Sequence, residues 1–206
     1  MDTRDYLKYI VDEIHTVIVA TVDKEGLPVT SAIDIMDFDD ESLYFLTAKG
    51  KGFYDRLKDK EFLAFTAIKG EDTLSSVAIS LKGKVREIGN EKIPYLFEKN
   101  SYMNSIYPTE KSRAQLTVFQ IYEGQGEWFD LSKKPIERAT FVFGDIIKKE
   151  SGYYINENCI GCGKCVEVCP QKCIEEEQVP FVIENNHCLN CGNCMDVCPY
   201  NAVERR

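Results

Sequence analysis

The chain has 206 residues and a formal net charge of −9 at pH 7, from 34 acidic and 25 basic side chains. An acidic surface repels phosphate backbones and anionic lipid headgroups, so neither nucleic acid nor a membrane is expected as a main partner. A chain of this length suits one medium domain with a small second domain.

The N-terminal segment, residues 1–14, is rich in charged residues and lacks the apolar stretch of a signal peptide. No apolar run in the chain reaches the length of a membrane-spanning helix. We therefore expect a cytoplasmic protein. An anaerobic source is a separate expectation.

The first segment predicts a helix from Arg4 to Ile14, because its apolar side chains recur on one face and Thr3 is placed to cap it. Short β-rich runs follow, separated by turn residues, and their number is typical of a barrel. They are His15–Asp23, Val29–Met36, Leu43–Thr47, Phe62–Ile68, Val77–Ile88, Leu116–Glu123, Glu127–Leu131 and Ala139–Phe143. Helices are predicted over Phe53–Lys60 and Glu91–Lys99, and a hairpin turn at residues 24–26.

A change in composition marks a domain boundary, because all nine cysteines lie between Cys159 and Cys198. We place a barrel domain at residues 1–147 and a cysteine-rich domain at residues 148–206. Residues 144–154 read as a connector too short to let the domains move far apart. Because disulfides are rare in the cytoplasm, the clustered cysteines indicate metal binding.

The cysteines form an internal repeat with a period of 29 residues. Each half has three cysteines at two-residue spacing and a fourth, three residues further on, followed by proline. The halves are Cys159, Cys162, Cys165 and Cys169, then Cys188, Cys191, Cys194 and Cys198.

This spacing is that of bacterial proteins with two [4Fe–4S] clusters, in which the fourth cysteine of each run binds the other cluster. One cluster is therefore assigned to Cys159, Cys162, Cys165 and Cys198, and the other to Cys188, Cys191, Cys194 and Cys169. A pair of zinc sites is the alternative, since C-x-x-C pairs also hold zinc.

For other residues near this motif, we expect a structural role or a place on the surface. Cys173 aligns with Ala202 in the repeat, so it is expected to be a buried thiol, with a redox or ligand-exchange role as the alternative. His187 is expected at the surface, although it precedes Cys188 and could reach a cluster sulfur. The run of glutamates at residues 175–177 reads as a solvated face, with a docking patch for a basic partner as the alternative.

The earlier part of the chain resembles the pyridoxamine 5′-phosphate oxidase-like family over residues 3–145. The resemblance rests on residues 26–33 (GLPVTSAI), 43–51 (LYFLTAKGK), 62–65 (FLAF) and 79–85 (ISLKGKV). It implies a mainly β fold, a split barrel with decorating helices that binds FMN, here followed by a small α+β ferredoxin-like iron–sulfur domain. It also implies a homodimer with FMN at the subunit interface.

The resemblance places Ser31 and Ile33 beside the flavin, and Thr47, Lys49 and Lys51 at its phosphate. The last three residues offer a hydroxyl and two cations where a strand meets a helix N-terminus, which attracts phosphate. Trp128 and Phe129 are expected in a packed core or interface, with stacking near the flavin as the alternative.

The sequence departs from the oxidase members of the family. Ser31 stands where they carry arginine, and residues 51–53 (KGF) stand where they carry Ser-Arg-Lys. We therefore expect a reductase in preference to a pyridoxamine phosphate oxidase.

The sequence supports two functional hypotheses. The first is a flavin-dependent oxidoreductase whose two clusters relay single electrons to or from FMN, which acts on a small molecule. The second is a non-catalytic electron carrier or redox sensor that serves a partner protein. A haem-binding barrel is a third possibility, weakened by the presence of only two histidines.

Overall fold

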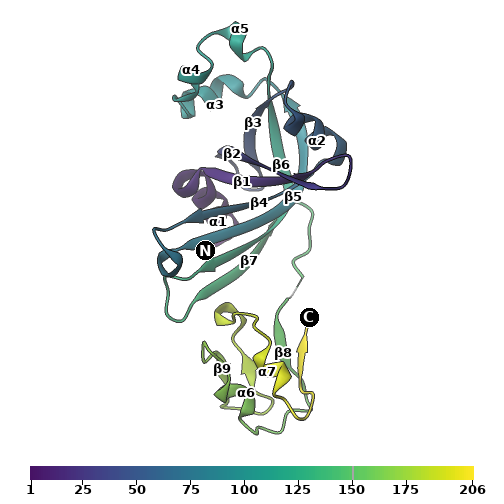
Figure 1. Ribbon diagram of the computed structural model, residues 1–206. Coiled ribbons are helices and arrows are strands. Elements are labelled where there is room, and N and C mark those ends of the chain that lie inside the picture. The colour runs from purple at the N-terminus through teal and green to yellow at the C-terminus, as the bar shows by residue number, and fades with distance from the viewer. Residues whose placement is uncertain (150) are drawn as a thin grey trace. The chain divides into compact units, whose positions relative to one another are not determined.

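The computed structural model describes residues 1–149 and 151–206, and it divides the chain into two compact units (Figure 1). The first, here called the barrel unit, comprises residues 1–71, 77–128 and 140–148. The second, here called the cysteine unit, comprises residues 72–76, 129–139 and the described residues of 149–206. Glu150, within the expected connector, lies outside the described residues.

A seven-stranded sheet in the order β3-β2-β1-β4-β5-β6-β7 forms the barrel. An additional pairing of β3 with β6, in which Phe45 faces Phe119, closes strands β1 to β6 on themselves. The strands are β1 (Thr16–Val22), β2 (Pro28–Phe38), β3 (Leu43–Ala48), β4 (Phe62–Lys69), β5 (Val77–Gly89), β6 (Leu116–Asp130) and β7 (Glu137–Phe143). The predicted split barrel is therefore confirmed.

Strand β6 is one continuous strand, whereas the sequence predicted two strands, Leu116–Glu123 and Glu127–Leu131. Gly124 and Gly126 lie within this strand and contact aromatic rings. A Cβ at Gly126 would collide with the ring of Phe141, and one at Gly124 with the ring of Phe143. Glycine is thus required here because the rings of neighbouring residues occupy the space of a side chain.

The N-terminal helix α1 (Thr3–Tyr9) continues as a π-helical turn, Ile10–Ile14. Its cap is Asp2, whose side chain accepts a hydrogen bond from the Asp5 backbone, so the prediction of Thr3 as the cap was wrong. Aspartate can form the reciprocal capping box with Asp5, which places the helix start one residue earlier. The buried Trp128 packs its ring against Tyr6 and Tyr9 of this segment, as expected for a core residue.

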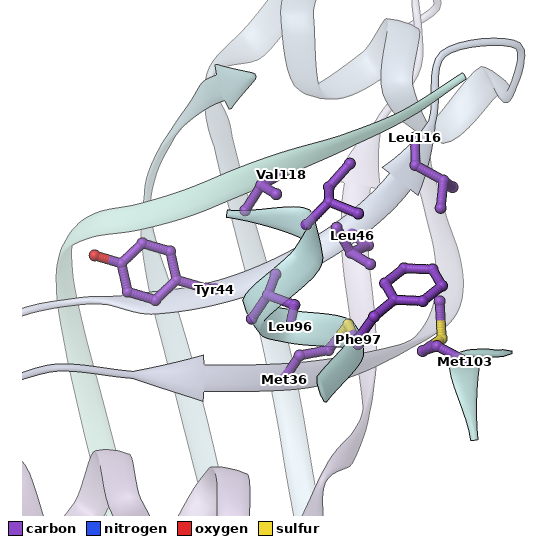
Figure 2. Packing of buried hydrophobic residues seen from close by; sticks show 9 residues of the cluster. Met36, Tyr44, Leu46, Leu96, Phe97, Met103, Leu116 and Val118 are labelled. Carbon is purple, nitrogen blue, oxygen red and sulfur yellow. The ribbon is translucent and has the colours of Figure 1, made fainter. Parts of the chain in front are cut away.

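Helix α3 (Ile93–Lys99) covers part of the barrel wall (Figure 2). Its side chains Leu96 and Phe97 pack with residues of β2 and β3, among them Met36 and Leu46. The short helices α4 (Met103–Ile106) and α5 (Glu110–Arg113) follow and were missed by the sequence analysis. Helix α2 (Gly52–Lys60) lies between β3 and β4 in the chain, as predicted.

The buried carboxylate of Asp37 on β2 joins the barrel to α3. It pairs with Lys92 and Lys99, each at 2.7 Å. Burial acts to raise the pKa of Asp37, but hydrogen bonds and charge from the two lysines outweigh it and hold the pKa below its ordinary value.

The cysteine unit contains only short elements, together with segments of the chain that precede its cysteines. Strand β8 (Tyr153–Ile155) pairs with β11 (Val203–Arg205), and β9 (Ile174–Glu175) pairs with β10 (Val182–Ile183). Helices α6 (Lys164–Glu167) and α7 (Asn193–Asp196) complete it, together with 3-10 turns at residues 73–75 and 185–187. Within the described residues, no helix has the length and apolar character needed to cross a membrane.

Candidate functional site

The 29-residue repeat appears in the backbone as paired left-handed residues. Gly161 and Asn190 occupy equivalent positions with φ of 74° and 55°, and Gly163 and Gly192 have φ of 77° and 84°. Lys172 and Asn201 form a third such pair. These residues turn the chain sharply before α6 and α7, where an ordinary side chain would be strained. The same loop geometry is therefore built twice.

The first cavity of the cysteine unit is open to solvent, and about 330 Å³ of space lies between its lining atoms when the open part is included. The cysteines that line it are Cys159, Cys162, Cys165 and Cys198. The surrounding wall is apolar, with Phe181 and Val203 buried and Ile160 exposed at the rim. Three cysteines of the first run and one of the second thus meet around a single space.

The second cavity is also open to solvent, with about 320 Å³ of space between its lining atoms when the open part is included. Its cysteines are Cys169, Cys173, Cys188, Cys191 and Cys194. Apart from Cys173, these are three cysteines of the second run and the fourth cysteine of the first. In the described part of the chain, no three His, Cys, Asp or Glu side chains converge as tightly as one metal ion would require. The sulfurs surround the cavities instead of meeting at one point.

Cys173 is buried, as predicted from its alignment with the equally buried Ala202. Its Sγ lies 3.5 Å from the Sγ of Cys169. The sequence did not predict that the ninth cysteine would line the second cavity, because the repeat offers only alanine at the equivalent position.

The environment acts differently on the individual thiols. Burial raises the pKa of Cys165, and it raises the pKa of Cys194 to about 11. The pKa of Cys188 is lowered, because the Cys173 thiol and the Asn190 backbone donate to its sulfur and Arg138 adds positive charge. Because the thiolate is the metal ligand, binding at the buried thiols must displace protons.

In the barrel unit, the predicted phosphate contacts lie where β3 ends and α2 begins. Thr47 is buried, and its Oγ1 has no hydrogen-bond partner among the described residues. Lys51 occupies the N-cap position of α2, whose first turn receives no side-chain cap. An unpartnered buried hydroxyl beside an uncapped helix N-terminus fits a phosphate group.

Glu87 of β5 is a member of this site that the sequence analysis missed. Its carboxylate accepts hydrogen bonds from Thr117 at 2.8 Å and Tyr54 at 3.1 Å, and it pairs with Lys58 at 3.2 Å. Lys49 lies further away, with its Nζ 3.7 Å from Glu87 Oε1. Burial raises the pKa of Glu87, but the three closer partners outweigh it and lower the pKa. An ionised carboxylate therefore lies beside the ammonium group of Lys49.

Ser31 and Ile33 lie on β2, where they pair with Val19 and Val17 of β1. Both are half-buried, and they share one face of the strand because they are two residues apart. Ile35 on the same face pairs with Phe45 of β3, two residues before Thr47. The strand pairing thus brings Ile33 and Thr47 to the same region of the barrel wall.

Two models of known protein families match different regions of the chain. The family model described as "Pyridoxamine 5'-phosphate oxidase" matches residues 3–125, and the model described as "4Fe-4S dicluster domain" matches residues 143–203. No curated protein matches the chain.

Solved structures resemble the barrel at low sequence identity. A NimC/NimA family protein from Clostridium acetobutylicum is 14% identical with a TM-score of 0.56, over 68% of this chain and 91% of that one. A protein from the same organism related to general stress protein 26, of the pyridoxinephosphate oxidase family, is 17% identical with a TM-score of 0.52, over 66% and 94%. An FMN-binding protein from Nostoc punctiforme is 10% identical with a TM-score of 0.50, over 69% and 90%.

At such identities these structures establish the fold alone, whereas the first family model covers more than half of the chain. The match to a 4Fe–4S dicluster domain indicates a redox protein with iron–sulfur cofactors. The chain belongs to the pyridoxamine 5′-phosphate oxidase family and carries a 4Fe–4S dicluster domain after the barrel.

Proposed function

We propose that this protein is a flavin-dependent oxidoreductase in which two [4Fe–4S] clusters relay single electrons to or from FMN. The observation that carries the proposal is the lining of the two cavities. Each contains three cysteines of one run and the fourth cysteine of the other, which is the ligation expected of two clusters.

The ligand sets follow from this lining. Cys159, Cys162, Cys165 and Cys198 hold one cluster, and Cys188, Cys191, Cys194 and Cys169 hold the other. Backbone N–H groups at Asn190 and Ala202 donate to Cys188 Sγ and Cys198 Sγ, both at 3.3 Å. Such donors stabilise the negative charge of a cluster and raise its reduction potential.

The flavin site is proposed at the β3–α2 junction. Thr47, Lys49 and Lys51 hold the phosphate of FMN, and Ser31 and Ile33 lie beside its ring. Bound FMN supplies the exchange between one-electron and two-electron chemistry. The 3.7 Å separation between Lys49 and Glu87 is long for an ion pair, so Lys49 can turn to a phosphate without loss of a strong contact.

A homodimer of barrels is part of the same proposal. The large apolar side chains Ile18 and Val22 of β1 and Phe62 and Ile68 of β4 are exposed on two paired strands. An apolar surface on neighbouring strands is typical of an association site. A cytoplasmic protein of an anaerobic organism, acting on a small molecule or a redox partner protein, remains our expectation.

The experiment is anaerobic stopped-flow reduction of the flavin by a ferredoxin-type one-electron donor. It compares the natural chain with a variant in which Cys162 and Cys191 are both replaced by alanine. These two cysteines are the exposed ones among the cavity-lining set, so their loss disturbs the packing least. We expect the natural chain to reduce its flavin through the clusters, and the variant to react at least tenfold more slowly.

Direct photochemical reduction of the flavin is the control, and its rate should be the same in both proteins. Equal rates with the ferredoxin-type donor would overturn the relay. Purified protein that contains zinc without sulfide, or binds no flavin after reconstitution, would overturn the cofactor assignment.

A further inference from the structure

A short segment preceding the cysteine runs forms part of the cysteine unit. This segment, residues 129–139, is here called the hairpin end, because it joins β6 to β7. The backbone carbonyl of Ile136 lies 2.7 Å from His187 Nδ1, and the Ile136 N–H donates to Gln171 Oε1 at 3.3 Å. His187 directly precedes Cys188, and Gln171 follows Cys169 by two residues. The hairpin end therefore contacts both chain segments that supply ligands to the second cavity.

Arg138 brings a positive charge to the same place. Its Nη1 donates to the backbone carbonyl of Cys188 at 3.1 Å. When the Asn190 amide is oriented with its oxygen toward Arg138, that oxygen also accepts from Nη1 and Nη2, at 2.5 and 3.3 Å. The backbone N–H of Asn190 in turn donates to Cys188 Sγ at 3.3 Å. Arg138 thus holds both ends of the short loop that carries a donor to a ligand sulfur.

The first cavity has no equivalent arrangement in the described residues. The repeat places Gly161 where Asn190 stands, so no side chain is available to accept from an arginine. Tyr200 stands where Gln171 stands and is 46% exposed. Cys159 is half-buried, whereas its counterpart Cys188 is 7% exposed. The cation at the first cavity is Lys164, whose exposed side chain is screened by water.

We propose that Arg138 raises the reduction potential of the cluster in the second cavity above that of the cluster in the first cavity. The cluster in the second cavity is then the one that is reduced first. Reduction adds one electron from the donor to the cluster, and no bond is made or broken. A fixed positive charge in a partly buried site stabilises the added negative charge more than an exposed one does. This inference rests on the proposed function, because it requires a cluster in each cavity.

The test is an anaerobic redox titration of the full-length protein with dithionite and mediators, followed by the magnetic spectra of the reduced clusters. Natural protein should show two midpoint potentials. Arg138→Gln should lower one of them, by an amount equal to about a tenfold change in the ratio of reduced to oxidised cluster, or ~59 mV for one electron. Arg138→Lys keeps the charge and should retain most of the natural value.

Lys164→Gln is the matched control, because it removes one charge at the rim of the first cavity. Arg138→Gln is expected to lower one midpoint potential, and Lys164→Gln should not change that potential. The inference would be overturned if Arg138→Gln left both potentials unchanged or shifted both equally. It would also be overturned if Arg138→Lys lowered the potential as much as Arg138→Gln does. If Arg138→Gln does not retain its iron, the test rests on Arg138→Lys. Midpoint potentials equal to those of the natural protein support a charge effect, and shifted midpoint potentials overturn it.

Iron and sulfide analysis of the natural protein separates this inference from the proposed function. Natural protein without about eight iron and eight sulfide per chain contradicts the two clusters themselves. A full complement with no effect of Arg138 contradicts only the role of the hairpin end.

Discussion

The two units of the molecule are stabilised by different means. The barrel unit buries bulky apolar side chains completely, including Phe45, Phe119 and Leu7. The cysteine unit has strands of two or three residues, and cysteines make up four of the nine residues in its buried cluster. Two of its cavities lie where the cysteines meet. The barrel unit is thus stabilised by the packing of its own apolar side chains, whereas the cysteine unit has cavities lined by cysteines among its few apolar residues.

Stability has a different source in each unit. Apolar burial contributes about 25 cal/mol per Å², so long paired strands with filled interiors can fold without a cofactor. Small units with little apolar core depend on metals or other cross-links.

Removal of iron should unfold one unit and leave the other folded. Treatment with an oxidant and a chelator should unfold the cysteine unit, because its cavities would be left unfilled, while the barrel unit stays folded. Two-dimensional amide NMR spectra should show loss of dispersion for residues 151–206 and retention for barrel residues. Dispersed signals from both units after complete loss of iron would contradict the contrast.

Replacement of Cys169 by alanine should remove one cluster, because Cys169 lines the second cavity although it belongs to the first run. Iron should fall from about eight to about four atoms per chain. The magnetic spectrum of the reduced variant should lose the interaction between two clusters. Loss of the cluster at Cys159, Cys162 and Cys165 instead would show that the ligation is not crossed.

Gly126→Ala should destabilise the barrel unit by about 1–3 kcal/mol, because the added Cβ would collide with the Phe141 ring. Chemical denaturation followed by tryptophan fluorescence measures this change, since Trp128 is the single tryptophan. Gly50→Ala is the control, because a Cβ there meets no atom within 4 Å. Equal stability of the two variants would show that the strand adjusts to the ring.

Asp37→Asn should lower the stability of the barrel unit at pH 7 by about 1–2 kcal/mol, through loss of its hydrogen bonds to Lys92 and Lys99. Because the folded pKa of Asp37 is lowered, its contribution is present above the ordinary value of about 3.9 and is lost as the pH falls through the folded pKa. Denaturation of both proteins between pH 7 and pH 3 should therefore show a difference that shrinks below pH 4.

Asp40→Asn removes an exposed partner of Arg4 and should have no measurable effect, which makes it a suitable control. A difference between natural protein and Asp37→Asn that stays constant down to pH 3 would contradict the role of charge at Asp37.

Cys173→Ala should have the smallest effect and leave about eight iron atoms per chain. Cys173 lines the second cavity, but the crossed runs already supply four ligands to each cluster. Iron analysis and the magnetic spectrum of the reduced protein measure the outcome. Loss of four iron atoms would make Cys173 a ligand in place of one of those assigned.

The sequence predicted the barrel and the two groups of cysteines because both depend on local information. Alternation of apolar residues marks strands, and the spacing of the cysteines determines which of them can surround one cluster. It did not predict Glu87 beside Lys49 or Arg138 beside Cys188. These residues reach their places through strand pairing and chain reversal, which depend on contacts between distant parts of the chain. It also divided β6 into two strands, because the ring contacts of Gly124 and Gly126 appear only when Phe141 and Phe143 are placed.

The hairpin end has a consequence for how such a protein can arise and be divided. A gene fragment that encodes residues 151–206 contains every cysteine, yet it lacks the peptide that contacts His187 and Gln171. A cut at the connector would leave Ile136, which is 6% exposed in the intact chain, without those neighbours. The cysteine unit therefore includes a loop that lies outside this fragment, and we expect the fragment to be exchanged between relatives together with the matching loop.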